Sequence, residues 1–416
     1  MTATRRQDIW QRHYRRQAKE ACWVVGAAFV ILTPAFSAIA YPQSAPLQSR
    51  VSDAVKPYLA DHSIAGAVTL VTNKEKTIDL QAFGYADLAA KQPMKTDSIF
   101  WIASMSKPIT ATALMMLVDQ GKVHLDDPVQ KYLPDFRPGI LRVAEDGETV
   151  RLEQPRTMIT LRELLSHTSG LPFATPVEAQ GGDRYRLAVR VKAYAMTPLG
   201  FEPGTEYQYS SAGLNVIGLV VEVVSGMPFE TFLKVNLFDP LEMQETGFLL
   251  SDKQRPRLAT TYLQDGSGEL YPTPIRRLHE PYSDSQTRFS FPGGGLFSTA
   301  SDMAKFCRMI LNDGLLNGHR YLSPEAVAEM TRNQLSDEIR RNAGFLVGRG
   351  YGLGWSTGPG DRIGHLGADA TGMELNPKQG IAAIWMVQQN DAAGGSTAAR
   401  KAFERAVFDS ESEKHF

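Results

Sequence analysis

The sequence predicts an α+β fold in which one antiparallel sheet is built from both chain ends, is flanked by helices and carries a large helical insertion. Strand patterns occur early, over 65–71 and 77–85, and return only late, over 352–356, 371–375 and 380–387. Between these two groups the apolar residues recur with helical periodicity. The chain has 416 residues, of which 43% are hydrophobic, so it is long enough to bury a sizeable core.

The first 40 residues are typical of a targeting segment. Residues 1–20 carry six Lys and Arg side chains, and an apolar run over 21–40 ends in Ala38-Ile39-Ala40. These features predict a signal peptide that is cleaved after Ala40. The alternative is an uncleaved membrane anchor through residues 21–40, because about twenty apolar residues can span a bilayer. Either interpretation exports the rest of the chain, and we expect it in a bacterial periplasm or cell envelope.

Residues 41–416 are expected to form a single two-lobed domain. The sheet lobe is predicted over about 45–100 and 345–410, and the helical lobe over about 101–344. Helical patterns cover 44–60, 104–121, 159–166, 211–225, 228–236, 300–314, 323–333 and 396–408. A polar stretch between the first two strand patterns predicts a hairpin. The Gly- and Pro-rich stretch 264–294 is predicted to be a long surface connection near the functional site.

Charge and composition exclude several classes of function. The formal net charge is −1, so no basic surface is expected to bind nucleic acid. Only Cys22 and Cys307 occur, which excludes a disulfide framework and a cysteine-rich zinc site. The histidines are scattered without paired ligand spacing, so neither a metal nor another cofactor is expected.

The strongest candidate for chemistry is Ser104-Met105-Ser106-Lys107, at the predicted start of a long helix. Serine needs an adjacent base to act as a nucleophile, and positions i and i+3 share a helix face, so the Lys107 amine can reach the Ser104 hydroxyl. The partial positive charge of the helix start helps to keep the lysine neutral. The alternative is an N-cap serine followed by a solvated lysine, because roughly one such tetrad is expected by chance in this composition.

Two further side chains could join this pair. Tyr209 precedes a predicted helix, whose N-terminus would favour the phenolate and make Tyr209 a general base beside Lys107. His365, between two late strand patterns, could bind a substrate carboxylate or carbonyl, and Gly367 would let the substrate approach closely. Each has a structural alternative: Tyr209 as a half-buried aromatic residue, and His365 as a surface histidine.

A rival nucleophile is Ser356, within Gly354-Trp355-Ser356-Thr357-Gly358. This pattern matches the nucleophile elbow of α/β-hydrolases, which requires a helix directly after the serine. Here Pro359-Gly360 and a further strand pattern follow, so we favour a strand of the sheet. His167, in Leu164–Leu171, is interpreted as a turn residue that could also line the site.

Together these pieces resemble the serine β-lactamase and penicillin-binding-protein superfamily, in its branch of class C β-lactamases, family VIII esterases and D-peptidases. The resemblance covers most of residues 45–408 and depends on several motifs in order. They are IFWIASMSKPITA around Ser104 and Lys107, LLSHTSGLP at 164–172, PGTEYQYSSAG at 203–213, GGGLFSTASDMAKF at 293–306, YGLGW at 351–355 and GHLG at 364–367.

The resemblance implies a β-lactamase/transpeptidase-like fold and a role for each matching residue. Ser104 would be the acylated nucleophile, and Lys107 its proton acceptor or electrostatic partner. Tyr209 occupies the tyrosine position of the second motif, the presumed general base. His365 and Gly367 occupy the third motif. The backbone N–H groups of Ser104 and Ala368 would form the oxyanion hole.

Two departures from the family pattern point to the expected function. Ser211 stands where the second motif commonly has asparagine, and a serine hydroxyl offers fewer contacts. His365 replaces a common lysine and removes a permanent positive charge. We therefore expect an exported serine hydrolase acting on an ester or amide, closer to an esterase or D-peptidase than to an efficient β-lactamase. The alternatives are a class C-like β-lactamase and a non-catalytic scaffold that binds penicillin or peptidoglycan. The expected partner is a small-molecule ester, peptide or β-lactam substrate.

Overall fold

The computed structural model describes residues 45–409, apart from 137–140, 145–149, 180, 266, 344–348 and 391–393. The predicted signal peptide or anchor over residues 1–40 lies outside the described residues. The part that carries the fold, Gln43–Phe416, forms one compact unit.

The main sheet has eight strands, and both ends of the chain contribute to it, as the sequence predicts. Its order is β12-β13-β14-β15-β16-β1-β2-β3, and every pairing in it is antiparallel. The early and late strands meet where Val68 of β1 lies opposite Met386 of β16. The bounds are β1 (Gly66–Asn73), β2 (Thr77–Asp87), β3 (Gln92–Pro93), β12 (Gly350–Tyr351), β13 (Ser356–Thr357), β14 (Ile363–Leu366), β15 (Gly372–Asn376) and β16 (Ile381–Met386).

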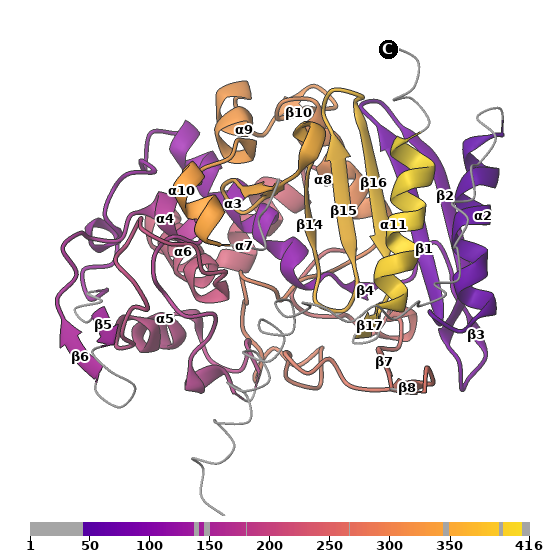
Figure 1. Cartoon of the computed structure of the whole chain (residues 1–416), viewed down its shortest axis with the longest axis horizontal. Coiled ribbons are helices and arrows are strands. Elements are labelled where there is room, and N and C mark those ends of the chain that lie inside the picture. The colour runs from indigo at the N-terminus through magenta and orange to yellow at the C-terminus, as the bar shows by residue number, and fades with distance from the viewer. Residues whose placement is uncertain are drawn as a thin grey trace, which may run out of the picture. The chain divides into compact units, whose positions relative to one another are not determined.

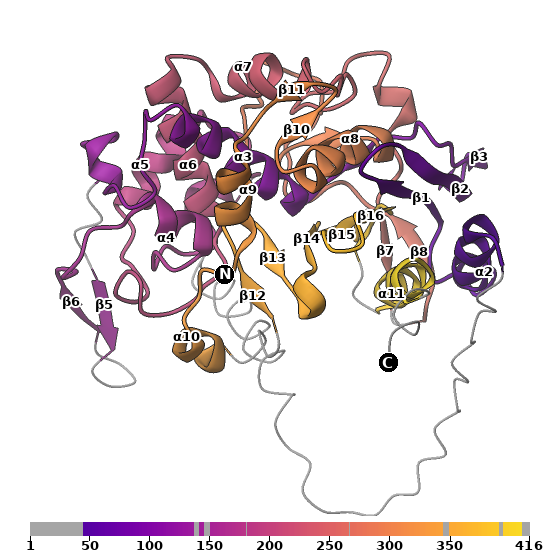
Figure 2. The same cartoon turned by 90° about the horizontal axis from the view of Figure 1, so that it is seen from above.

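Helices cover both faces of this sheet, so its central strands are apolar on both sides (Figures 1 and 2). Successive side chains of a strand point to opposite faces. Val68 of β1 accordingly joins the large core shared with the helical insertion. Its neighbour Ala67 joins a second cluster beneath the terminal helices α2 (Leu47–Ala60) and α11 (Gly395–Phe408). The two terminal helices pack against each other as well as on the sheet.

The helical insertion is organised around α3 (Ser106–Asp119), whose residues from Ser106 to Leu117 are all buried. Around it lie α4 (Leu161–Ser166), α5 (Leu187–Ala195), α6 (Ser211–Ser225), α7 (Phe229–Leu233) with a π-helical turn over Lys234–Phe238, α8 (Ala300–Leu311), α9 (Pro324–Thr331) and α10 (Asp337–Asn342). Short strand pairs are β4 (Phe100–Trp101) with β9 (Phe297–Ser298), β5 (Leu141–Ala144) with β6 (Val150–Glu153), and β10 (Leu315–Leu316) with β11 (His319–Arg320). A fourth small sheet has three strands, β7 (Tyr262–Gln264), β8 (Leu270–Pro272) and β17 (Gln389–Asn390).

The late strands differ in detail from the sequence prediction. Residues 352–356, predicted as one strand, mostly connect the two-residue strands β12 and β13. The reason lies at Gly354, whose φ is +75° and where a Cβ would come within 2.9 Å of the Lys107 carbonyl oxygen. Only glycine allows the backbone to turn this close to α3. His365 likewise lies within β14 rather than between strands.

No single described helix is long and apolar enough to cross a membrane. The bent pair Ser211–Ser225 and Phe229–Phe238 passes that test by length and composition only, and α6 lies largely buried in the core.

Candidate active site

Ser104 lies at a strained corner between β4 and α3. The chain leaves β4 and turns at Ala103, whose φ of +46° is unusual for a residue with a side chain. A single 3₁₀ turn over Ala103–Met105 then leads into α3, which begins at Ser106 rather than at Ser104 itself. The Ser106 hydroxyl fixes the corner by donating to the Ala103 carbonyl at 2.7 Å. Ser104 remains partly exposed between buried neighbours, so its hydroxyl is accessible to a substrate.

The Lys107 amine is buried and surrounded by oxygen atoms. Its Nζ lies 3.0 Å from Ser104 Oγ, 3.3 Å from Ser211 Oγ and 2.5 Å from the carbonyl oxygen of Gly293. The side chain is 0% exposed. Burial, and then the positive charge of Arg277, lower the pKa of Lys107 well below its usual range. All three oxygen atoms lie within hydrogen-bond distance of the amine, and the lowered pKa makes Lys107 a candidate acceptor for the Ser104 proton.

A chain of buried polar side chains holds the Gly293 carbonyl in place. Asn215 of α6 accepts a hydrogen bond from the Gly293 N–H at 3.0 Å and donates to the Tyr194 hydroxyl at 2.8 Å. That hydroxyl donates to Glu178 at 2.6 Å. Moving the Gly293 backbone would leave these buried polar groups without partners, which is costly. The network therefore fixes the Gly293 carbonyl oxygen that contacts Lys107.

Tyr209 and Ser211 enter the site from the start of α6. Ser210 caps this helix by accepting from the Gly213 N–H, which leaves its neighbours free to face Lys107. The Lys107 Nζ lies 4.8 Å from the centre of the Tyr209 ring. Contrary to the expectation that the helix start favours a phenolate, burial raises the pKa of Tyr209, outweighing a hydrogen bond to Ser104 and the charge of Arg277. Tyr209 is therefore a phenol at neutral pH.

His167 packs against Tyr209 from the end of α4. It is the αL C-cap of that helix, so the interpretation as a turn residue is correct, and it is also 0% exposed. Its Nδ1 accepts a hydrogen bond from the Ser210 N–H at 3.2 Å. The His167 ring centre lies 4.5 Å from those of Tyr209 and Tyr351. The imidazole thus forms one wall for the Tyr209 ring.

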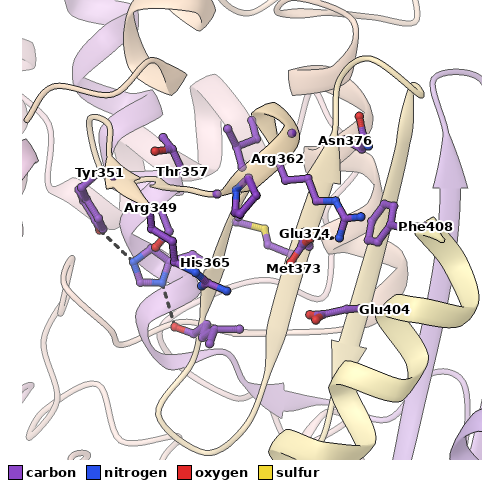
Figure 3. Close-up of a pocket in the computed structure, with 18 of the residues that line it drawn as sticks. Arg349, Tyr351, Thr357, Arg362, His365, Met373, Glu374, Asn376, Glu404 and Phe408 are labelled. Atoms are coloured by element: carbon purple, nitrogen blue, oxygen red, sulfur yellow. Dashed lines mark hydrogen bonds and ion pairs between the residues drawn. The ribbon is translucent and has the colours of Figure 1, made fainter. Parts of the chain in front are cut away.

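His365 faces Tyr209 from the sheet, with 6.1 Å between the two ring centres. Figure 3 shows its imidazole between the Tyr351 hydroxyl and a backbone carbonyl. Because the Leu366 carbonyl, 2.8 Å from Nδ1, can only accept, Nδ1 carries the proton, and Nε2 accepts from Tyr351 at 2.9 Å. Burial, and next the nearby Lys107, lower the pKa of His365 to about 3. The imidazole is therefore neutral over the physiological range.

The Gly367–Ala368 turn lies against the chain just before Ser104. The Gly367 N–H donates to the Thr371 carbonyl at 2.7 Å, and the Thr371 hydroxyl donates to the Ile102 carbonyl at 3.3 Å. A Cβ at Gly367 would come within 2.7 Å of that same Ile102 oxygen. Ala368 itself is exposed. Ser104 and Ala368, the predicted oxyanion-hole residues, thus belong to two chain segments that contact each other.

A cavity of about 830 Å³ opens beside these groups. Tyr207, Tyr209, Tyr351 and His365 line it, whereas Ser104 and Lys107 are not among its lining residues. It continues along β14 toward α11, where Arg362 pairs with Glu374 at 3.0 Å (Figure 3). This is enough space for a small organic substrate.

Ser356 does not form a nucleophile elbow. It lies in β13, paired with Gly364 of β14, and the chain continues through a 3₁₀ turn over Pro359–Asp361 into β14. An elbow requires an α-helix directly after the serine. The α/β-hydrolase alternative is therefore wrong, and Gly354 allows the chain to turn close to α3.

Sequence reasoning missed several groups around the site. Gly293 was given no role of its own, although the prediction that the connection 264–294 lies near the site is confirmed by the contact of its carbonyl with Lys107. Asn215, Tyr351 and Arg277 were not singled out. Asn215 gave one usable signal, because it is the polar residue in the apolar stretch Leu214–Val221 of α6. Tyr351 begins the YGLGW motif, but nothing there marked it as a partner of His365, and nothing local distinguished Arg277. The described residues hold no group of three side chains suited to a metal ion.

Comparisons with known proteins agree with this geometry. The family profile described as Beta-lactamase matches residues 51–406. Protein Rv1367c of Mycobacterium tuberculosis (strain ATCC 25618 / H37Rv) is 34% identical over 349 residues, covering 78% of this chain and 86% of the relative. Esterase EstB of Burkholderia gladioli is 30% identical over 346 residues, covering 76% and 79%.

Solved structures share the fold. EstCE1, described as a hydrolase with promiscuous acyltransferase activity, has a TM-score of 0.72 at 25% identity, over 86% of this chain and 98% of its own. Simvastatin synthase (LovD) of Aspergillus terreus has a TM-score of 0.74 at 22% identity, over 89% and 100%, which supports the fold alone. With the match to the family profile, these findings show that the chain belongs to the beta-lactamase family of serine hydrolases.

Proposed function

We propose that this protein hydrolyses an ester or amide through an acyl-enzyme on Ser104, with the preferences of an esterase or D-peptidase rather than of an efficient β-lactamase. The observation that carries the proposal is the fully buried Lys107 amine, 3.0 Å from a partly exposed serine hydroxyl. A neutral amine at that distance is a suitable base for a serine nucleophile.

In acylation, neutral Lys107 takes the proton from Ser104 as Oγ bonds to the substrate carbonyl carbon. The resulting tetrahedral oxyanion is stabilised by the backbone N–H groups of Ser104 and Ala368. Collapse of this intermediate breaks the bond to the alcohol or amine. The leaving group takes a proton from the Tyr209 hydroxyl, which is replenished from Lys107. Tyr209 suits this role because it is protonated at neutral pH.

In deacylation, the same groups act on water. A water molecule replaces the leaving group, gives its proton to the Tyr209–Lys107 pair and adds to the acyl carbon. Collapse of the second tetrahedral intermediate releases the acid and returns the proton to Ser104 Oγ. No cofactor is required for either half-reaction.

The neutral His365 supports a preference for esters or peptides over β-lactams. An anionic β-lactam gains from a permanent cation in the third motif, and an imidazole whose pKa is about 3 supplies none at neutral pH. Relatives named as an esterase and as putative D-alanyl-D-alanine carboxypeptidases are consistent with this preference. Ser211 still reaches Lys107 at 3.3 Å, so the altered second motif keeps its contact with the amine.

Active-site labelling tests the proposal. A fluorophosphonate probe should label the wild-type protein, and Ser104→Ala should abolish labelling while leaving the melting temperature within a few degrees. Ser356→Ala removes the rival serine in β13 and serves as the matched control that should still be labelled. Labelling that persists in Ser104→Ala would overturn the assignment of the nucleophile.

A substrate panel tests the finer part. Purified protein should turn over a short-chain 4-nitrophenyl ester faster, by kcat/KM, than a chromogenic cephalosporin, with a D-alanyl peptide as the third substrate. Faster turnover of the cephalosporin would make the chain a class C-like β-lactamase. Stable acylation by penicillin, without turnover of any of the three, would support the non-catalytic scaffold instead.

We also propose that residues 1–40 export the protein to the bacterial periplasm or cell envelope. The basic flank and apolar run of this segment support the proposal. N-terminal sequencing of the protein from an envelope fraction should give a chain that begins at Tyr41. An intact N-terminus in the membrane fraction indicates an anchor, and recovery from the cytoplasm contradicts export.

A further inference from the structure

The segment Ile275–His279 brings an arginine, Arg277, to the site from a part of the chain that none of the family motifs includes. This segment is anchored on both sides. The Arg277 carbonyl accepts a hydrogen bond from the Gly182 N–H at 2.8 Å, and the His279 N–H donates to the buried Asp183 carboxylate, also at 2.8 Å. Asp183 in turn forms a buried ion pair with Arg288, in which both side chains are 1% exposed.

Apolar packing also holds the segment Ile275–His279 in place. Ile275 and Leu278 are 2% and 6% exposed, and they belong to a cluster that also contains Ala103, the residue before the nucleophile. The backbone that carries Arg277 therefore packs with the corner that positions Ser104. An arginine fixed in this way is preorganised, which lowers the entropic cost of holding a ligand.

The Arg277 side chain points to the aromatic residues of the site. Its guanidinium carbon lies 4.6 Å from the centre of the Phe173 ring, and Phe173 stacks on Tyr209 with 6.0 Å between ring centres and an angle of 23°. The Phe173 carbonyl accepts from the Ser211 N–H at 3.2 Å, so this platform is tied to the start of α6. Arg277 is thus one aromatic ring away from Tyr209.

The charge of Arg277 affects the pKa values of Lys107 and Tyr209. It contributes to lowering the pKa of Lys107, and it opposes the rise in the pKa of Tyr209. Burial lowers the pKa of Lys107 well below its usual range and that of His365 to about 3, so His365 supplies no positive charge at neutral pH. A guanidinium keeps its charge and matches the geometry of a carboxylate.

We propose that Arg277 binds a carboxylate of the substrate, so that the preferred ester or amide is anionic. Arg277 lies on the connection between β8 and β9, and ring contacts run from it through Phe173 and Tyr209 to His365, so its charge is placed elsewhere than the third-motif cation that an anionic β-lactam uses. The proposal rests on the hydrolase function argued above. The carboxylate belongs either to the acyl group or to the leaving group, and the two sources are distinguished by substrate pairs.

The test compares each anionic ester with a neutral ester of similar shape. For the acyl side, the pair is the mono-4-nitrophenyl ester of adipic acid and 4-nitrophenyl hexanoate. For the leaving-group side, it is 4-butanoyloxybenzoate and its methyl ester. The measured quantity is the ratio of kcat/KM, anionic over neutral, within each pair. Any effect of Arg277 on the pKa of Lys107 acts on both members and cancels in this ratio.

In wild-type protein the anionic member should be preferred in one pair, and that pair identifies the half of the substrate that carries the charge. Arg277→Gln should lower the ratio of that pair by about tenfold or more, and Arg277→Lys by less, because an ammonium lacks the two-pronged geometry. Arg276→Gln removes an equal charge from the exposed neighbouring residue and is the matched control, with an expected change below about twofold.

The possible failures are distinguishable. If Ser104 is labelled by the fluorophosphonate but both ratios in Arg277→Gln stay within about threefold of wild type, the carboxylate proposal is overturned and the hydrolase function stands. An equal fall in the Arg276→Gln ratios also overturns it, because a diffuse field would then explain the effect. If Ser104 is not labelled, the hydrolase function fails and this proposal fails with it.

Discussion

The two sides of the active site are built in different ways. On the helical side, the Lys107 amine contacts three oxygen atoms, one of which is fixed by the chain of Asn215, Tyr194 and Glu178. On the sheet side, His365 is held by one tyrosine hydroxyl and by the carbonyl of the next residue. Lys107 thus belongs to an extended buried hydrogen-bond network, whereas His365 has two hydrogen-bond partners and lies at the edge of a cavity.

This difference suits the helical side to proton transfer and the sheet side to substrate binding. A proton acceptor must keep a lowered pKa, and this requires exclusion of water and fixed neighbours, which the helical side provides. A group that faces a substrate needs access to the cavity more than it needs a network, and His365 lines that cavity. We therefore expect changes on the lysine side to affect kcat strongly, and changes on the histidine side to affect KM or stability.

The largest effect is expected for Lys107→Met. Loss of the base should lower kcat/KM for a short-chain ester by about a thousandfold or more. The free energy of unfolding should stay constant or rise, because a buried amine is replaced by an apolar side chain of similar length. Steady-state kinetics and urea unfolding measure the two quantities. Lys131→Met, at an exposed helix turn, is the control. Unimpaired turnover by Lys107→Met would remove the lysine side from the chemistry.

Tyr209→Phe should have the next largest effect. Without the hydroxyl, proton delivery to the leaving group is lost, and kcat should fall by about a hundredfold. The loss should be smaller for esters with acidic leaving groups such as 4-nitrophenol, which depart without a proton, than for alkyl esters. Tyr207→Phe removes a hydroxyl two residues away in the same cavity wall, and it should cost much less. Equal losses for both classes of ester would contradict a role in protonating the leaving group.

The sequence was sufficient for the fold and for the reactive pair, because both depend on local patterns. Strand and helix periodicity placed the sheet at both chain ends, and the three-residue spacing brought Lys107 to Ser104, as the 3.0 Å distance shows. Tyr209 and His365 required the order of the family motifs, since neither is distinctive alone. The protonation state of Tyr209 was misjudged because helix position was visible in the sequence, whereas the burial that dominates its pKa was not.

The supporting residues could not be predicted because they act over long separations. Asn215 contacts Gly293 across 78 positions, and Lys107 contacts Gly293 across 186. Such pairs are formed by tertiary packing, which leaves no local pattern in a single sequence. Helices α5 and α10 were missed for a related reason, because both are short and their stability comes from packing rather than from periodicity.

Asn215→Ala tests the network behind Lys107 and should have an intermediate effect. The Gly293 N–H and the Tyr194 hydroxyl lose a partner inside the core, so the protein should lose about 1–3 kcal/mol of stability. A displaced Gly293 carbonyl would also loosen Lys107, and kcat should fall by about tenfold with little change in KM. Asn236→Ala, whose amide donates to the Phe232 carbonyl outside the site, is the control. A loss confined to stability would reduce Asn215 to a structural role.

The smallest effect concerns His365 and the dependence of stability on pH. Burial lowers the folded-state pKa of His365 to about 3, whereas an unfolded histidine titrates near 6.5. Between these values the unfolded chain binds a proton that the folded chain does not, so stability falls as the pH drops from about 6.5 toward 3. The contribution of one histidine to this slope is about 1.4 kcal/mol per pH unit.

His365→Gln should therefore flatten the pH dependence of the unfolding free energy between pH 6 and 4, whatever its effect on stability at pH 7. Urea titrations at half-unit intervals measure the slope. His124→Gln, at an exposed position, should leave the slope unchanged. Since the pKa of buried His167 is also lowered, part of the slope should persist in His365→Gln. An unaltered slope would mean that the His365 imidazole takes up a proton in the folded protein. His365 would then be a positively charged group of the site, which is the role that the carboxylate proposal assigns to Arg277.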